Sequence, residues 1–315
     1  MQIIGDAPLG TPDNDARRSV VTIGAYDGVH SGHRAVIAHV RERARALGCR
    51  SVVVTFDRHP ASVVRPESAP KLLTSLEQKL ELLADTGIDA VYVVRFDEES
   101  SLESPTAFVE RALVGDLRAK EVVVGEDFHF GHKRSGNVAL LREVGAAHDF
   151  TVAPLELIAR PDGVAEPVSS TAIRRALAGG QVEVARRLLG RDFEIRGVVV
   201  HGDERGRTIG FPTANVEVSG IYCMPADGVY AGRVTLDDGS VHSCAINIGR
   251  RPTFVDHADH SLLEVHLLDF SGDLYDRHVR VSFVKFLRSE RKFDGLDALK
   301  AQLAVDIAAT RDALR

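Results

Sequence analysis

The sequence predicts a protein of the α/β plus β class, with a doubly wound parallel sheet in a first domain and a small β-barrel with one packing helix in a second. Apolar strands alternate with amphipathic helices as far as residue 189, as in a parallel sheet covered by helices. From Arg191 onward, short apolar runs separated by turn residues replace that alternation, as in a small barrel. Residues 296–314 then carry apolar side chains near helical spacing. We place the domains at 1–186 and 187–315.

The composition fits two globular domains. The chain has 315 residues, 44% of them hydrophobic, so each domain can bury its own core. Because the formal net charge is -6, we expect neither nucleic acid nor a membrane as a partner. Residues 1–6 lack a signal-peptide pattern, and no apolar run approaches the roughly 20 residues that span a bilayer. The three cysteines, Cys49, Cys223 and Cys244, look unpaired, which favours the reducing cytoplasm. The oligomeric state stays open, a homo-oligomer included.

The first domain is expected to alternate strand and helix throughout. Its strands are expected at 19–23, 50–56, 90–96, 121–125 and 150–157, and its helices at 34–47, 72–84, 105–114 and 181–189. Such alternation implies right-handed crossovers between parallel strands. Ligands then bind outside the carboxyl ends of the strands, which directs attention to the loops that follow them.

The turn at residues 24–33 joins the first of these strands to its helix. Its glycines let the backbone approach a ligand, and the free amides at the helix start suit a phosphate. His30 and His33 lie three residues apart at this anion site, where imidazolium or neutral imidazole donors can stabilise charge on a phosphate in the transition state. A surface pair or a fragment of a zinc site is the alternative, although the cysteines supply no matching motif.

Three further loops of the first domain have two interpretations each. His59 follows the second strand and is either a substrate contact or an ordinary loop residue. Residues 126–136 carry aromatic, histidine and basic side chains that suit a flat ring with a phosphate, or Phe128 and Phe130 belong to the core. The Ser169-Ser170-Thr171 run, with Arg174 one turn later, is a helix N-cap or a grip for the phosphates of a nucleotide.

The barrel domain has a second polar loop, at residues 201–215. Strands are expected at 194–201, 229–236, 241–248, 262–268 and 279–284. The glycines of the loop can fold over phosphates, and Thr213 and Asn215 offer the hard oxygen ligands that magnesium prefers. A glycine-rich hairpin is the alternative, since no Walker A motif is present. Glu264, on a strand face shared with His266, is a general base or an exposed strand residue.

These segments together resemble a known family. The order and spacing of residues 24–33, 55–60, 124–136, 169–177, 206–215, 247–254 and 262–275 are similar to those of the bifunctional prokaryotic riboflavin kinase/FMN adenylyltransferases, also called FAD synthetases. The resemblance runs nearly end to end. It implies a transferase that uses ATP with riboflavin and FMN as substrates and makes FMN and FAD.

For the first domain, the resemblance implies a Rossmann-like nucleotidyltransferase with a His-x-Gly-His motif, which transfers AMP from ATP to FMN and releases pyrophosphate. His30 and His33 would be catalytic. The ATP would be bound by Gly24, Asp27, Gly32, Ser170, Thr171 and Arg174, and the FMN would lie near His59, Asp127, Phe128 and Phe130.

For the second domain, the resemblance implies a riboflavin kinase barrel. Thr213 and Asn215 would bind the Mg²⁺ of ATP, and Glu264 would take the proton of the ribityl 5′-hydroxyl. The kinase ATP site would comprise Gly206, Arg207, Gly210, Thr213 and Asn215. Arg288 would lie near the flavin.

The sequence departs from the family pattern only in the first domain. Ala25 and Tyr26 replace an asparagine and a phenylalanine, Arg58 replaces a proline, and His129 stands where arginine is common. Two alternatives follow: an enzyme with kinase activity alone, or a regulatory module that binds flavin without turnover.

Overall fold

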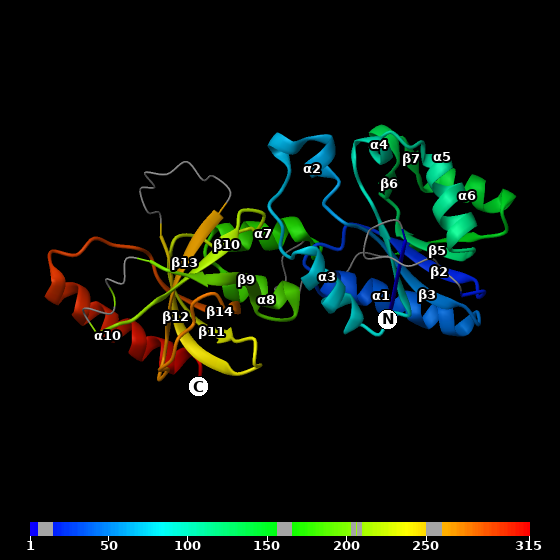
Figure 1. Cartoon of the computed structure of the whole chain (residues 1–315). Helices are drawn as coiled ribbons and strands as arrows, with labels where there is room; N and C mark the ends of the chain where they lie inside the picture. Colours follow the sequence, from blue (N-terminus) through cyan, green and yellow to red (C-terminus); the bar gives the residue numbers. More distant parts are fainter. Residues whose placement is uncertain (6–14, 156–165, 203–205, 207–209, 250–259) are drawn as a thin grey trace. The chain divides into compact units, whose positions relative to one another are not determined.

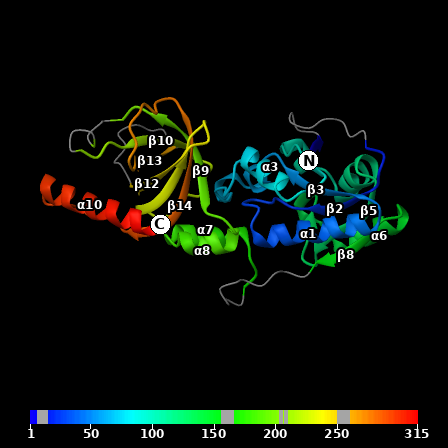
Figure 2. The ribbon, with the colours of Figure 1, turned by 90° about the horizontal axis from the view of Figure 1, so that it is seen from below.

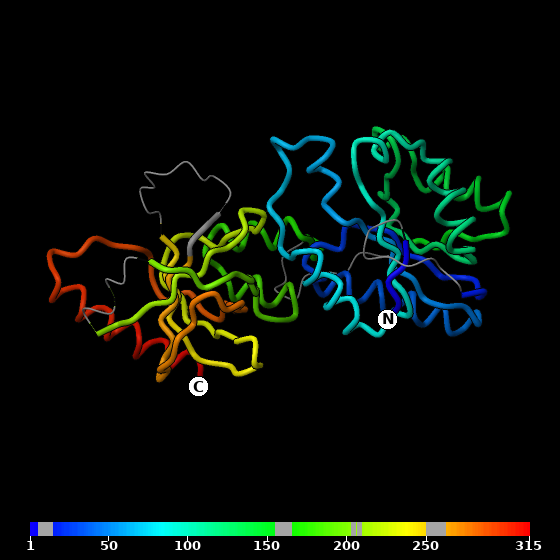
Figure 3. Tube along the Cα trace, in the orientation of Figure 1, coloured from blue at the N-terminus to red at the C-terminus, as the bar shows by residue number. Residues whose placement is uncertain are grey.

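The computed structural model describes residues 1–5, 15–155, 166–202, 206, 210–249 and 260–315. The chain forms two compact units, shown in Figures 1 and 3. Unit 1 contains Met1–Pro70 and Ser75–Val168, and unit 2 contains Lys71–Thr74 and Ser169–Arg315. Helices α7 (Ser170–Ala178) and α8 (Val182–Leu189) therefore belong to unit 2, while the domain boundary near residue 187 stays a prediction.

Unit 1 is built on a six-stranded parallel sheet of order β1-β4-β3-β2-β5-β8. The strands are β1 (Gln2–Gly5), β2 (Ser19–Ile23), β3 (Arg50–Phe56), β4 (Ala90–Val94), β5 (Ala119–Gly125) and β8 (Thr151–Leu155). The doubly wound parallel sheet predicted from the sequence is confirmed. The edge strand β1 was not predicted, because four residues are too short to show a periodicity.

Helices cover both faces of this sheet, and alternate strand residues fill two separate cores. Val20 packs with residues of α1 (Ser31–Ala46) and α3 (Leu76–Ala84), whereas Val21 packs with the opposite layer. That layer contains α5 (Pro105–Phe108), the π-helix η2 (Val109–Asp116) and α6 (Val138–Ala147). Shorter elements are α2 (Ala61–Val64), η1 (Pro66–Ser68), α4 (Glu98–Ser101), β6 (His129–Phe130), η3 (His132–Arg134) and β7 (Gly136–Asn137). The two apolar faces explain why the strands read as continuous apolar runs.

The helix predicted at residues 72–84 begins later, at Leu76. Ser75 caps it, because its hydroxyl accepts from Gln78 N at 3.2 Å and Gln78 Oε1 accepts from Ser75 N at 2.9 Å. Leu72 instead exchanges backbone hydrogen bonds of 2.7 Å with Ile221 and Cys223 of unit 2. The capping box was a stronger start signal than the apolar residue at position 72.

The strand order places the topological switch point of the sheet at β2. The chain passes from β2 to β3 and β4 on one side, then returns to β5 on the other side of β2. The loops after β3, β2 and β5 therefore lie side by side at the carboxyl edge. Ligands of open α/β sheets bind at such a point.

Unit 2 is a closed six-stranded antiparallel barrel of order β10-β13-β12-β11-β14-β9, as the sequence predicted. Its strands are β9 (Phe193–Val200), β10 (Ala214–Ser219), β11 (Gly228–Thr235), β12 (Val241–Ile248), β13 (His260–Leu267) and β14 (His278–Arg288). Strand β10 was not predicted. The tail helix α10 (Leu296–Ala313) contacts β11, β12 and β14, and α8 contacts β9 and β14 (Figure 2). The predicted packing of the tail helix on the barrel is confirmed.

A fragment that starts at Ser169 is expected to melt several degrees above one that starts at Arg187. The shorter fragment lacks Val182 and Ala185, whose side chains are fully buried in α8. Removing a fully buried valine alone costs about 1.5–3 kcal/mol. Neither fragment contains residues 71–74. The difference between their melting temperatures therefore measures what α7 and most of α8 add to the barrel. Equal melting temperatures would show that α8 adds nothing to the barrel.

Candidate active sites

The side chain of His30 caps the first helix of unit 1. Its backbone is extended (φ -70°, ψ 173°), and its Nδ1 accepts a hydrogen bond from His33 N at 3.2 Å. In a neutral ring the proton therefore sits on Nε2. The rings of His30 and His33 stack with centroids 3.5 Å apart. Both predicted catalytic histidines thus share one fixed arrangement at the helix start.

The turn before this helix is held in a rare backbone conformation. Tyr26 and Val29 have φ of +51° and +37°, values that residues other than glycine seldom adopt. Tyr26 is anchored by a 2.8 Å hydrogen bond between its hydroxyl and Thr22 Oγ1, and its ring lies 4.7 Å from that of His33. At Gly32, a Cβ would come within 3.2 Å of the His30 ring, so glycine permits the stack. Strain of this kind gathers at functional sites.

His33 is neutral at neutral pH. Burial lowers the pKa of His33 well below its ordinary value, and the nearby charges of His30 and Lys79 lower it further. Part of the residue reaches solvent, but Nδ1 is buried and has no hydrogen-bond partner among the described residues. The sequence left open whether imidazolium or imidazole acts here, and the structure favours the neutral imidazole for His33.

Lys79 lies beside this turn and was not predicted from the sequence. It is 7% exposed on α3, and its ammonium group donates to Phe56 O, Thr55 Oγ1 and Ala25 O. Its position offered one signal: Lys79 stands three residues after Leu76 and four before Leu83, on the apolar face of the helix. A charged residue on that face calls for a specific partner.

The neighbouring loops bring further predicted residues to the same edge. His59 Nδ1 accepts from Ala61 N at 3.1 Å after β3. After β5, the rings of Phe128 and Phe130 stack at 5.4 Å, and Phe130 is buried against the core beneath. Asp127 O lies 2.8 Å from His129 Nδ1. Phe130 therefore packs into the core, and contacts of His59, Asp127, Phe128 and Phe130 with FMN stay predictions.

The Ser-Ser-Thr run caps a helix, as the simpler interpretation predicted. Ser169 Oγ accepts from Ala172 N at 3.1 Å at the start of α7. Arg174 Nε donates to Lys71 O at 2.6 Å within unit 2. Ser170, Thr171 and Arg174 thus belong to unit 2, whereas Gly24, Asp27 and Gly32 belong to unit 1. Phosphate binding by Ser170, Thr171 and Arg174 stays a prediction.

In unit 2, a polar row crosses three strands of the barrel. Glu264 on β13 is the direct cross-strand partner of Asn215 on β10 and of Asn247 on β12. Residues paired in this way have their side chains on one face, here the outer face, because Val216 and Val265 fill the interior. Asn247 Nδ2 donates to Glu264 Oε2 at 3.4 Å. Asn247 was not predicted as a site residue, since only strand register reveals it.

Asn215 and Thr213 fit a hard cation. Asn215 is 7% exposed, and its Oδ1 is buried with no hydrogen-bond partner among the described residues. A buried amide oxygen without a hydrogen-bond donor is suited to ligate magnesium, which prefers hard oxygen ligands. A Cβ added at Gly206 would lie 3.3 Å from Thr213 Oγ1, so the backbone of the loop passes close to this hydroxyl. Gly210 in the same loop has a φ of +88°. Arg207 lies outside the described residues.

Arg288 has a structural partner at the end of β14. Its guanidinium donates to Asp306 of α10 at 2.9 and 2.7 Å, and Gln302 donates to the same carboxylate at 2.7 Å. Asp306 is 4% exposed. This paired charge fixes the tail helix on the barrel, and a contact of Arg288 with flavin stays a prediction.

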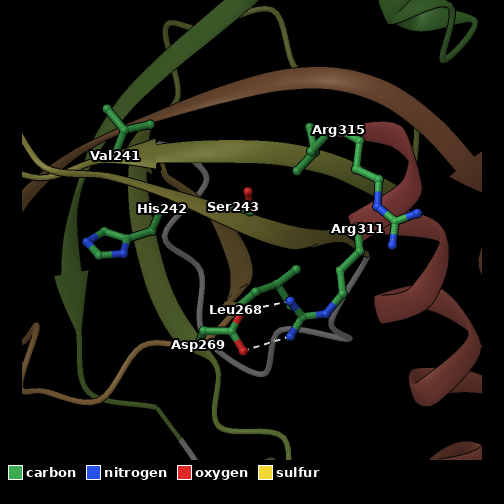
Figure 4. Close-up of a pocket in the computed structure, with 8 residues that line it drawn as sticks. Val241, His242, Ser243, Leu268, Asp269, Arg311 and Arg315 are labelled. Atoms are coloured by element: carbon green, nitrogen blue, oxygen red, sulfur yellow. Dashed lines mark hydrogen bonds and ion pairs between the residues drawn. The ribbon is translucent and has the colours of Figure 1, made fainter.

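A surface depression of about 430 Å³ lies elsewhere on unit 2 (Figure 4). It is lined by β12 residues such as His242 and Ser243 and by Arg311 of α10. Arg311 is paired with Asp269 at 2.7 Å through both nitrogens. None of the residues predicted for either site lines it, so we do not assign it to the reaction.

Comparison with known proteins agrees with both halves of this description. Residues 13–172 match the family model described as FAD synthetase, and residues 189–314 match that described as riboflavin kinase. A bifunctional riboflavin kinase/FMN adenylyltransferase of Pseudomonas fluorescens is 43% identical over 94% of this chain and 93% of its own. One from Listeria monocytogenes is 39% identical over 96% and 95%. A crystal structure described as a macrolide-efflux protein from Streptococcus pneumoniae covers 99% of both chains at 29% identity, with a TM-score of 0.83.

The fold and these matches define a two-domain transferase. Similarity extends through both units and nearly the full length of the relatives. The chain belongs to the family of bifunctional riboflavin kinase/FMN adenylyltransferases. The resemblance read from the sequence is confirmed.

We expect unit 1 to lose stability at His33 as the pH falls below about 6.5. The unfolded chain protonates this histidine near its ordinary pKa of 6.5, whereas the folded chain keeps it neutral. The unfolded state then binds more protons, and the free energy of unfolding falls by up to about 1.4 kcal/mol per pH unit. Hydrogen exchange of the β2 and β3 amides between pH 7.5 and 5 measures this dependence.

His33→Ala should flatten that pH dependence. His148→Ala, at an exposed histidine that ends α6, is the matched control and should keep it. Identical slopes for wild type and His33→Ala would show that His33 titrates as in the unfolded chain.

Proposed function

We propose that this chain makes FMN from riboflavin and ATP in unit 2, and FAD from FMN and ATP at the His30–His33 turn of unit 1. The observation that supports it most directly is the agreement between family membership and two formed polar sites. A module that only binds flavin does not need a carboxylate next to oxygen atoms that suit a metal ion. It also does not need a strained turn that carries two histidines. The regulatory alternative is therefore not favoured.

In the kinase reaction, Glu264 accepts the proton of the ribityl 5′-hydroxyl while that oxygen attacks the γ-phosphorus of ATP and ADP leaves. Asn247 holds the Glu264 carboxylate through its amide hydrogen bond. Thr213 and Asn215 supply the oxygens for Mg²⁺, which when bound would neutralise charge on the ATP phosphates. The loop with Gly206, Arg207 and Gly210 covers those phosphates.

In the adenylyltransferase reaction, the phosphate of FMN attacks the α-phosphorus of ATP and pyrophosphate leaves. Catalysis consists of positioning and charge stabilisation, because no covalent enzyme intermediate forms. His30 donates from Nε2, and His33 donates from its neutral imidazole, to the α-phosphate oxygens as negative charge builds there. His59, Asp127 and Phe128 at the neighbouring strand ends orient the FMN.

Residues at three of the departures from the family pattern have local hydrogen-bond or ion-pair partners. Ala25 contributes its backbone carbonyl, which accepts from Thr55 Oγ1 at 3.1 Å and from Lys79 Nζ at 3.3 Å. Tyr26 places its extra hydroxyl against Thr22, and Arg58 pairs with Asp57 at 3.1 Å. Because these substitutions have local partners, the alternative with kinase activity alone is not favoured.

We infer that the enzyme works in the cytoplasm on small molecules alone. The formal net charge of -6 supports the expectation that nucleic acid is not a partner. In the described part of the chain, no helix combines the length and apolar character needed to cross a bilayer.

The direct test supplies the wild-type protein with riboflavin, ATP and Mg²⁺ and separates the flavins by chromatography. FMN should appear first and FAD after it. If FMN forms but no FAD appears, even when FMN is supplied directly, the enzyme has kinase activity only. Bound riboflavin without either product would support the binding module.

Glu264→Gln should lower riboflavin phosphorylation about 10²–10⁴-fold, because the amide keeps the shape but cannot accept the proton. Riboflavin and ATP affinity should change little, and FMN supplied directly should still become FAD. Glu217→Gln, an exposed glutamate on β10, is the matched control. Undiminished phosphorylation by Glu264→Gln would remove the base assignment.

His33→Ala should lower FAD formation from FMN on the order of 10²–10³-fold, as for the loss of an oxyanion donor. Phosphorylation of riboflavin should be unchanged, since Glu264 and its neighbours belong to unit 2. Steady-state rates with each substrate separately measure both. FAD formation at the wild-type rate would exclude His33 from the reaction.

A further inference from the structure

Lys79 is a buried cation whose three hydrogen-bond acceptors are all neutral. Its side chain is 7% exposed, and its three N–H groups match three acceptors: Phe56 O at 2.7 Å, Thr55 Oγ1 at 3.2 Å and Ala25 O at 3.3 Å. Among the described residues it forms no ion pair with a carboxylate. Burying an ammonium group in this way costs stability, so its retention calls for a gain elsewhere.

The three acceptors belong to the two segments that begin the adenylyltransferase site. Ala25 lies in the turn that leads from β2 to His30, and Phe56 ends β3 directly before the loop that carries His59. Thr55 Oγ1 also donates to Ala25 O at 3.1 Å, which closes the network. The ammonium group therefore joins the carboxyl ends of adjacent strands at the switch point of the sheet.

We propose that Lys79 is a positioning residue for adenylyl transfer that acts as an ammonium ion, by fixing the His30–His33 turn to the end of β3. A neutral amine has two N–H groups and cannot serve all three acceptors. Loss of the bond to Ala25 O would leave that carbonyl with Thr55 Oγ1 as its remaining donor, and the turn that holds the histidines would lose its direct link to α3. A displacement of about 1 Å in such a site lowers the rate on the order of 10²-fold.

Titratable groups face Lys79 from several elements. Asp27 lies in the turn after β2, Asp57 follows β3, and His33 lies on α1. Burial lowers the pKa of Lys79 to about 8, and the two aspartates oppose this shift. The ammonium form is thus present at neutral pH and is lost as the pH rises through about 8. Its charge also contributes to keeping His33 neutral.

Stability and activity should then change in opposite directions with pH. Between pH 8 and the ordinary lysine value of 10.5, the unfolded chain binds the extra proton, so the contribution of Lys79 to the free energy of unfolding rises with pH. FAD formation should fall over the same range. A lysine with a merely structural role would lose activity and stability together.

The test measures FAD formation from FMN between pH 6.5 and 10 in wild type, Lys79→Arg and Lys79→Met. In wild type, the rate of FAD formation should fall as the pH rises through about 8; we call this fall the alkaline limb. Lys79→Arg keeps the charge, so its limb should move at least one pH unit higher, whatever its maximum rate. Lys79→Met should lose about 10²-fold in kcat at all pH values, with a smaller change in the KM for ATP.

Matched readouts separate the possible failures. Lys120→Met, at a partly exposed lysine 3.5 Å from Asp149, should behave as wild type, and riboflavin phosphorylation should be unchanged in every variant. Hydrogen exchange of β2 and β3 should show the alkaline rise in stability in wild type and not in Lys79→Met.

The inference rests on the proposed adenylyltransferase activity. A wild type that makes no FAD from FMN refutes both. An active wild type whose alkaline limb is unchanged in Lys79→Arg, or a Lys79→Met variant that keeps its rate, refutes only the role of Lys79.

Discussion

The contact on which the proposed adenylyltransferase site depends is the hydrogen bond from His33 N to His30 Nδ1 at the start of α1. It satisfies one of the open amides of the helix and sets the orientation of the first histidine ring. The second ring stacks on the first, and a Cβ on the residue between them would crowd the His30 ring at 3.2 Å. Gly32 therefore favours the geometry of the two histidines. Lys79 and Tyr26 hold the turn that precedes this contact.

The kinase site has a different physical basis, the register of a barrel. Three strands place Asn215, Glu264 and Asn247 in one row, and no loop conformation is needed to bring them together. A row of this kind is as rigid as the strand hydrogen bonds beneath it, which suits a base that must meet a hydroxyl group within about 3 Å. The tail helix is held to the same barrel through the buried pair of Arg288 and Asp306.

Sequence alone gave the two architectures and the positions of both histidines, because long apolar runs and glycine turns leave clear patterns. It missed β1, which has four residues, and it missed β10 and α6, which follow the polar loops at 201–215 and 126–136. It also missed Lys79 and Asn247. A lysine in a helix usually faces solvent, and the partner of an asparagine on a strand depends on register, so neither role follows from local sequence. That Phe130 packs into the core depends on how the chain turns after β5, which local sequence does not show.

The closure of the barrel has a consequence for the behaviour of unit 2 outside the full chain. Every strand of β9 to β14 has a neighbour on both sides, so the backbone offers no open edge for another molecule to extend. The parallel sheet of unit 1, by contrast, ends in β1 and β8. Intermolecular strand addition, the common route to aggregates, is thus open to the sheet but closed to the folded barrel. An isolated barrel with its helices should remain dispersed at concentrations where the isolated sheet unit associates.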